Sequence, residues 1–219
     1  MVSSLISISA RMAIAGPKAI TPPTVTYLRD EQVNAAIERG IHGKPRAIGV
    51  TMIDMQTSLL SAMACTYCAV SGYSITVLTP EEFIESQAAL ARKEMKPFTL
   101  SDVTPEMRQP LLHVFAMPSR ASYISGAGLS MASSVHRVVM TDANKGEIIQ
   151  PVDSTNGTVE DNSALRSFTY QSAGATFAMT DVVHLREKDA KGEFYIVVVG
   201  DNQNKYFKVK ERYARLLFR

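Results

Sequence analysis

FYIVVV, at residues 194–199, is the most strongly patterned stretch of the chain and the starting point for predicting its fold. β-Branched and aromatic residues in such a run are typical of a strand. The polar residues 200–204 then predict a turn, and residues 205–209 predict the second strand of a hairpin. Burial of each Val or Ile contributes about 1.5–3 kcal/mol. We therefore expect this hairpin to anchor the core.

A strand followed by a well-capped helix is the next clearest unit. Residues 73–78 (YSITVL) predict the strand. Thr79, Pro80 and Glu82 then match the N-cap, the first helical position and the third position of a capping box, and Pro97 ends the helix. We expect this amphipathic helix to cover a face of the sheet through Ile84, Ala88, Ala91 and Met95.

Weaker patterns predict the other elements. A short helix over residues 30–39 would have Asp30 as its cap and Gly40 in the left-handed position after its last turn. Further strands are predicted at residues 47–53, 111–117, 135–141, 147–152, 168–172 and 175–179. Further helical segments are predicted at residues 104–106, 180–191 and the C-terminus, where the docking residues would be Tyr213, Leu216 and Leu217. Over residues 58–70 the periodicity does not distinguish a strand from a helix. Residues 153–163 are polar and predict a loop.

Together these elements predict an α+β protein with a mostly antiparallel sheet, or a β-sandwich-like core, and two to four short helices. A chain of 219 residues that is 46% apolar can bury a sizeable core. We expect residues 29–219 to form a single globular domain, because residues 153–163 offer the only internal boundary and the part beyond them is too small for a core of its own. Residues 1–28 are expected to be flexible.

The N-terminal residues leave two interpretations open. Ala13-Ile14-Ala15 would suit a signal-peptide cleavage site and is followed by a proline-rich stretch, but residues 1–9 contain no Lys or Arg and Arg11 interrupts the apolar run. The segment is therefore either a degenerate signal peptide or a frayed terminus, and an exported location is as compatible with it as a cytoplasmic one. The apolar residues 58–70 are too few to span a bilayer, so we expect a soluble protein without a transmembrane helix.

Cys65 and Cys68 form the sharpest local motif, a CxxC pair. A redox pair of this kind needs a helix that begins at the first cysteine, and here an apolar run and a turn surround it. A structural role is the better interpretation. Two cysteines also supply only half of a tetrahedral zinc site, so we predict neither a metal nor a cofactor.

The four histidines are scattered and show no metal-binding spacing; they are His42, His113, His136 and His184. Within its apolar strand, His113 is expected to be a hydrogen-bonded core residue. The loop residues 125–130 (SGAGLS) match neither a phosphate-binding loop nor a nucleophile elbow. Acid–base pairs would require convergence in space among the aspartates Asp54, Asp102, Asp142 and Asp181. We therefore name no catalytic residue.

Residues 201–219 hold the chain's only strong charge bias, six basic residues against two acidic ones, interleaved with aromatics. Such a pattern can bind single-stranded nucleic acid. An edge strand protected by lysines, followed by a docked terminal helix, is the preferred interpretation, since the whole chain has a net charge of only +2.

These observations favour a non-enzymatic binding or interaction domain whose partner is a protein or a small ligand. Two alternatives stay open: a small hydrolase whose site is assembled from loops such as residues 119–134, and a weak nucleic-acid binder that uses the basic C-terminus. A pocket that gathers His113 or His136 with an Asp and a Ser would favour the hydrolase.

Overall fold

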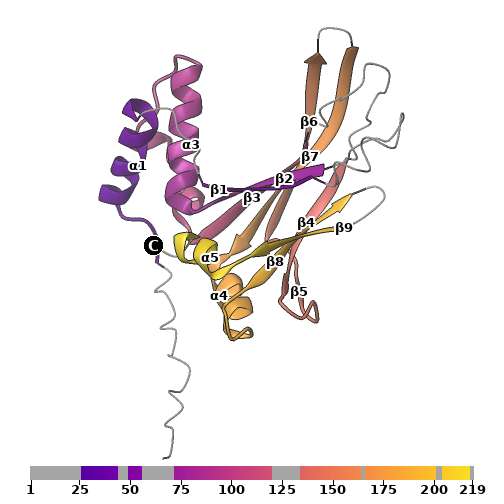
Figure 1. Ribbon diagram of the computed structural model, residues 1–219. Coiled ribbons are helices and arrows are strands. Elements are labelled where there is room, and N and C mark those ends of the chain that lie inside the picture. Colours follow the sequence, from indigo (N-terminus) through magenta and orange to yellow (C-terminus); the bar gives the residue numbers. More distant parts are fainter. Residues whose placement is uncertain are drawn as a thin grey trace, which may run out of the picture.

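Two antiparallel sheets pack face to face in the computed structural model, which describes residues 26–43, 49–55, 72–119, 134–163, 166–200 and 204–217 (Figure 1). The first sheet has the order β1-β2-β3-β7-β6, with bounds Val50–Met55, Gly72–Leu78, Leu111–Ser119, Arg166–Ala178 and Asp153–Ser163. The second has the order β5-β4-β8-β9, with bounds Ile148–Ile149, Val135–Asp142, Phe194–Gly200 and Asn204–Val209. The residues of the possible signal peptide lie outside the described part.

The described helices are α1, α3, α4 and α5, with bounds Asp30–His42, Pro80–Lys93, Met179–Glu187 and Glu211–Leu217. Two short 3-10 helices, Leu100–Asp102 and Glu106–Arg108, connect α3 to β3. The predicted α+β fold with antiparallel sheets and few short helices is confirmed. Within these residues, no helix has both the length and the apolar character needed to cross a membrane.

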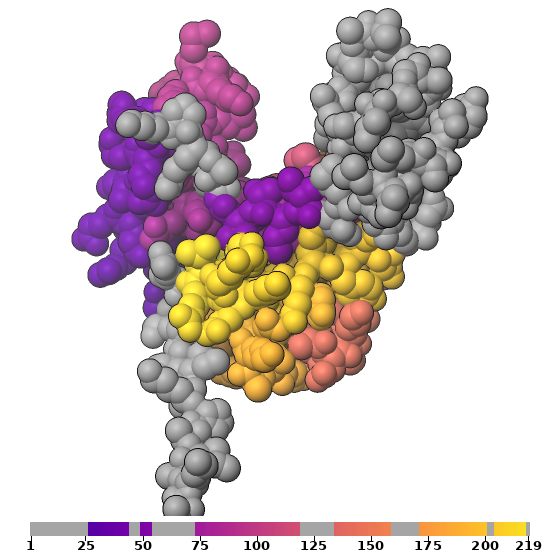
Figure 2. All heavy atoms as spheres, in the orientation of Figure 1, coloured from indigo at the N-terminus to yellow at the C-terminus, as the bar shows by residue number. Residues whose placement is uncertain are grey.

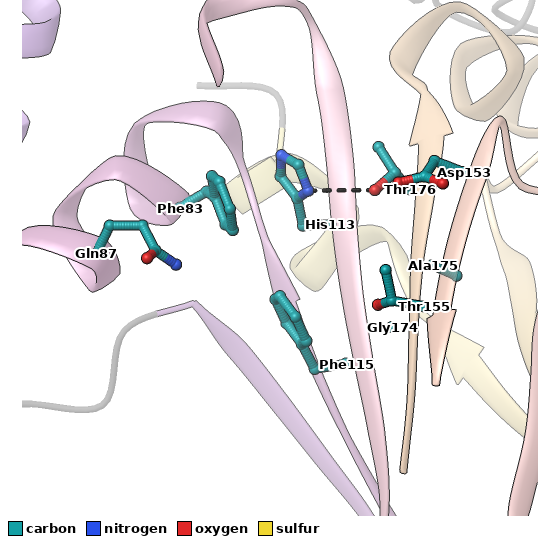
Figure 3. Close-up of a pocket in the computed structure, with 9 residues that line it drawn as sticks. All are labelled: Phe83, Gln87, His113, Phe115, Asp153, Thr155, Gly174, Ala175 and Thr176. Carbon is teal, nitrogen blue, oxygen red and sulfur yellow. Dashed lines mark hydrogen bonds between the residues drawn. The ribbon is translucent and has the colours of Figure 1, made fainter. Parts of the chain in front are cut away.

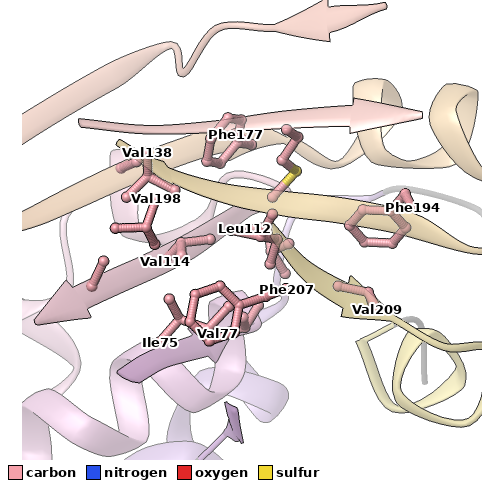
Figure 4. Close-up of a cluster of buried hydrophobic side chains, with 14 of the residues drawn as sticks. Ile75, Val77, Leu112, Val114, Val138, Phe177, Phe194, Val198, Phe207 and Val209 are labelled. Atoms are coloured by element: carbon pink, nitrogen blue, oxygen red, sulfur yellow. The ribbon is translucent and has the colours of Figure 1, made fainter. Parts of the chain in front are cut away.

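The main core lies between the two sheets (Figure 4). Alternate residues of each strand point into it, because successive side chains of a strand face opposite sides. From β8, Phe194, Ile196 and Val198 are fully buried there. They meet Ile75 and Val114 of the first sheet, among others. The stretch FYIVVV therefore anchors the core as predicted, and its hairpin with β9 is confirmed.

A pair of packed helices stands beside this sandwich. The capping box of α3 forms as predicted: the Glu82 N–H donates to Thr79 Oγ1 at 3.3 Å, and the Thr79 N–H donates to Glu82 Oε2 at 2.9 Å. The buried face of α3, with Ile84 and Ala88, packs mainly on α1 rather than on the sheet. The expectation that α3 covers a sheet face was therefore only partly right. The surface is hollowed beside this pair, over β1 and β2 (Figure 2).

Gly40 lies inside α1 rather than in a left-handed position after its end. The helix continues to His42, and Arg29, not Asp30, occupies the N-cap. A Cβ at position 40 would lie 2.5 Å from the Glu85 carbonyl oxygen and 2.6 Å from the Ala88 Cβ. The glycine is there because the backbones of α1 and α3 approach too closely for any side chain.

Residues 153–163, predicted as a loop, form the strand β6. They pair along their whole length with β7, which is one continuous strand over the region predicted as two. The described side chains of β6, up to residue 158, are exposed, which accounts for the polar sequence. Two smaller corrections concern helices: α4 ends at Glu187, before Lys191, and Leu216 of α5 is exposed while Leu217 is buried.

Replacing Gly40 by alanine tests the close approach of α1 and α3. Alanine has the higher helix propensity by about 1 kcal/mol, but its methyl group would collide with α3. We expect Gly40→Ala to lower the free energy of unfolding by about 1–3 kcal/mol, measured by urea denaturation. In the control Gly146→Ala the new Cβ would meet only the Asp142 carboxylate oxygens, at 3.9 Å. A Gly40→Ala protein as stable as the wild type would contradict this packing.

Candidate functional site

A pocket of about 300 Å³ lies between α3 and the outer face of the five-stranded sheet (Figure 3). Its walls come from α3, β3, β7 and β6. The lining residues are Phe83, Gln87, His113, Phe115, Asp153, Thr155, Gly174, Ala175 and Thr176. It is an open hollow with an aromatic side and a polar rim, which makes it the candidate functional site.

Strand register brings most of these residues together. His113 of β3 lies opposite Thr176 of β7, which in turn lies opposite Asp153 of β6. Two residues further along, Phe115, Gly174 and Thr155 form a parallel row. Side chains two apart in a strand share a face, so both rows point away from the sandwich core and into the pocket.

Three aromatic rings form one side of the pocket. The Phe83 ring stacks on the His113 imidazole with 4.0 Å between centroids and 19° between planes. The Phe115 ring is nearly parallel to that of Phe83, with 6.5 Å between centroids. Phe83 lies in the first turn of α3, whose position is held by the capping box. The rings are therefore held by regular elements.

Gly174 gives the pocket its floor. A Cβ at this position would lie 2.6 Å from Thr155 Oγ1 and 3.6 Å from the Phe115 ring. The Phe115 ring thus packs against bare backbone, an arrangement in which an aromatic residue covers a glycine on the neighbouring strand. Any side chain at position 174 would reduce the space beside Thr155.

His113 points to the outer face of the sheet and lies outside the main core, so its prediction as a core residue was wrong. Its Nδ1 lies 3.4 Å from Thr176 Oγ1. Its Nε2 is buried and has no hydrogen-bond partner among the described residues. Burial lowers the pKa of this imidazole from 6.5 to about 4. At neutral pH the ring is therefore uncharged.

The other residues considered from the sequence are not brought to this pocket. His42 pairs with Glu38, His184 pairs with Glu147, and His136 is exposed on β4. Asp102 accepts a hydrogen bond from the Thr99 backbone N–H. Asp142 accepts from the backbone N–H groups of Glu147 and Gly146, which lowers its pKa. Asp54 and Asp181 belong to β1 and α4.

Two predicted motifs lie outside the described residues, namely the Cys65/Cys68 pair and the loop residues 125–130. In the described ranges, no group of three or more His, Cys, Asp or Glu side chains could hold a metal ion.

Within the basic C-terminal segment, the described residues 204–217 form the edge strand β9 and the helix α5, as the preferred interpretation predicted. Several of its cations have partners within the protein. Lys208 pairs with Glu193 and Arg215 pairs with Glu211, each at 2.5 Å, while the Arg212 guanidinium lies 4.5 Å from the centre of the Tyr213 ring. Lys205 is buried. These contacts reduce the charge available to nucleic acid.

Sequence reasoning named His113 but missed the rest of the pocket. Asp153 and Thr155 were assigned to a loop, and Phe83 and Phe115 were treated only as parts of amphipathic or apolar elements. The alternation His113, Phe115 and Met117 along β3 was the one local signal, because it places aromatic and polarisable side chains on a face away from the core.

Comparisons with known proteins give no match: no protein-family model, no curated protein and no solved structure resembles this chain significantly. The site must be interpreted from its own geometry.

The pKa of His113 predicts how stability depends on pH. The unfolded chain takes up a proton at the ordinary pKa of 6.5 and the folded protein only at about 4. Protonation of His113 therefore does not affect the free energy of unfolding above pH 6.5. As the pH falls from 6.5 to 4, it lowers this free energy by at most about 3 kcal/mol. In His113→Phe, which keeps a ring against Phe83, urea unfolding at a series of pH values should show a flatter curve over this range. An imidazole resonance of His113 that titrates near pH 6.5 in the folded protein would refute the expectation.

Proposed function

We propose that the protein is a non-enzymatic binding domain whose site is the pocket between α3 and the five-stranded sheet. The observation that carries the proposal is the aromatic side formed by Phe83, His113 and Phe115 beside the polar groups of Asp153 and Thr155. Small-ligand sites typically combine apolar and aromatic walls with a few polar groups that orient the ligand.

The pocket is suited to binding because its parts have little freedom to move. Phe83 is held by its stacking on His113 and by the capped start of α3. His113, Phe115, Gly174 and Thr155 lie on paired strands. A site held in its binding geometry loses less conformational entropy when a ligand enters. Phe115 nevertheless remains 37% exposed, so it keeps apolar surface that a ligand can cover.

The same geometry favours binding over hydrolysis. A catalytic histidine needs a pKa near the working pH and a second group that orients its ring. In His113 the pKa is about 4, and Nε2 has no partner within the described residues. The pocket does bring an Asp and two threonines near this histidine, but the hydroxyl contact is long, at 3.4 Å, and Asp153 is exposed at the rim.

Binding of small probes would test the proposal. The probes are phenol, N-methylacetamide, n-butylamine and sodium butyrate, each titrated into the full-length protein while amide correlation spectra are recorded. We expect at least one probe to shift the signals of Thr155, Gly174, Thr176 and the Gln87 side chain in a saturable way, and to be recovered unchanged. Phe115→Ala should weaken that binding roughly tenfold, since it removes one aromatic contact surface.

A matched control separates the pocket from the rest of the surface. Leu216→Ala removes an apolar side chain that is about as exposed as Phe115, at 42%, but lies on α5. It should leave the probe affinity unchanged. If none of the four probes shifts the pocket signals, or if Leu216→Ala weakens binding as much as Phe115→Ala, the proposed site is wrong.

A further inference from the structure

We propose that the group bound in this pocket is a small organic cation, an alkylammonium such as the end of an amine ligand or of a lysine side chain. The inference rests on the proposed binding function and adds to it the chemical class of the ligand. It follows from the charge, the rings and the hydrogen-bond acceptors that the nine lining residues place around one cavity.

The charge of the lining residues favours a cation. Asp153 is the only ionisable carboxylate among them, and none of them is Lys or Arg. Asp153 lines the pocket from the exposed start of β6, and its carboxylate lies beside Thr176 (Figure 3). An anionic ligand would meet this carboxylate without any compensating positive side chain in the lining, so anions are disfavoured.

The rings add a second attraction for the same charge. The faces of Phe83 and Phe115 carry the negative part of the aromatic quadrupole, which attracts a cation within about 6 Å of the ring centre. The imidazole of His113 would repel a cation if it were protonated. Burial keeps its pKa near 4, so at neutral pH it behaves as a third uncharged ring.

The remaining polar groups can accept hydrogen bonds. An ammonium group has three donors and no acceptor. The oxygens of Asp153, Thr155 and Thr176 stand along the rim and can accept from it. The cavity of about 300 Å³ is at the small end of ligand sites. It therefore suits a head group of a few heavy atoms better than a large ring system.

A matched series of four-carbon probes tests the charge preference directly. n-Butylamine and n-butanol share one alkyl chain and differ in the head group, and sodium butyrate is the carboxylate with the same number of carbon atoms. In titrations of the full-length protein at one fixed salt concentration, followed by amide shifts of Thr155, Gly174 and Thr176, we expect the amine to bind roughly tenfold more tightly than the alcohol. Butyrate should bind more weakly than either.

Asp153→Asn should reduce the preference for the amine over the alcohol about fivefold, because it removes the charge and keeps the size of the side chain. Glu187→Gln is the matched control: it removes one exposed carboxylate from α4 that does not line the pocket, and the preference should stay as in the wild type. An equal loss of the preference for the amine in both variants would refute a role for Asp153.

Two further arms identify the source of the cation. Nα-acetyl-lysine-N-methylamide and its norleucine analogue differ only in the ammonium group. Tighter binding of the lysine compound than of n-butylamine would support a partner protein, and weaker binding would support a free amine; in both cases the lysine compound should bind more tightly than its norleucine analogue. If n-butanol or butyrate binds at the pocket as tightly as n-butylamine, the cation inference is wrong while the binding function stands. If none of the probes reaches the pocket, both fail.

Discussion

The alternation of side chains along β3 joins the core of the protein to its pocket. Leu112, Val114 and Ala116 are buried between the two sheets, while His113 and Phe115, between them in sequence, face α3 on the other side. A shift of one residue in the pairing of β3 would exchange these two sets. The same burial that holds the register of β3 therefore also places the histidine and the phenylalanine of the pocket.

The helix pair supplies the second half of the site by a different means. The buried residues of α3 pack on α1. In that contact the buried Glu85 forms an ion pair with Arg39 at 2.9 Å. Only Phe83 and Gln87 of α3 reach the pocket. Because the helix is held by α1 and by its capping box, these two side chains can face a partly open cavity without being needed for the core.

Local sequence patterns predicted the elements that burial or capping defines. FYIVVV and the Thr79–Glu82 box are of this kind, since their signals lie within a few residues. β6 was missed because its polar side chains are exposed and its stability comes from pairing with β7, which no short window reveals. Gly40 was misassigned because a glycine near the end of a helical pattern usually marks its end, unless another helix packs there. The pocket was missed for the same reason as β6, because its residues come together only through the register of strands far apart in the sequence.

Two glycines show how this chain makes room at close contacts. Gly40 lets α1 approach α3, and Gly174 lets the Phe115 ring lie on β7 beside Thr155. The first contact positions the helix that bears Phe83, and the second positions the ring of Phe115. In a shallow cavity a ligand gains little from enclosure, so its affinity depends on contacts that are already in place before it arrives. Both rings are set in place by backbone contacts rather than by mobile side chains, so the aromatic surface of this open pocket exists before any ligand enters.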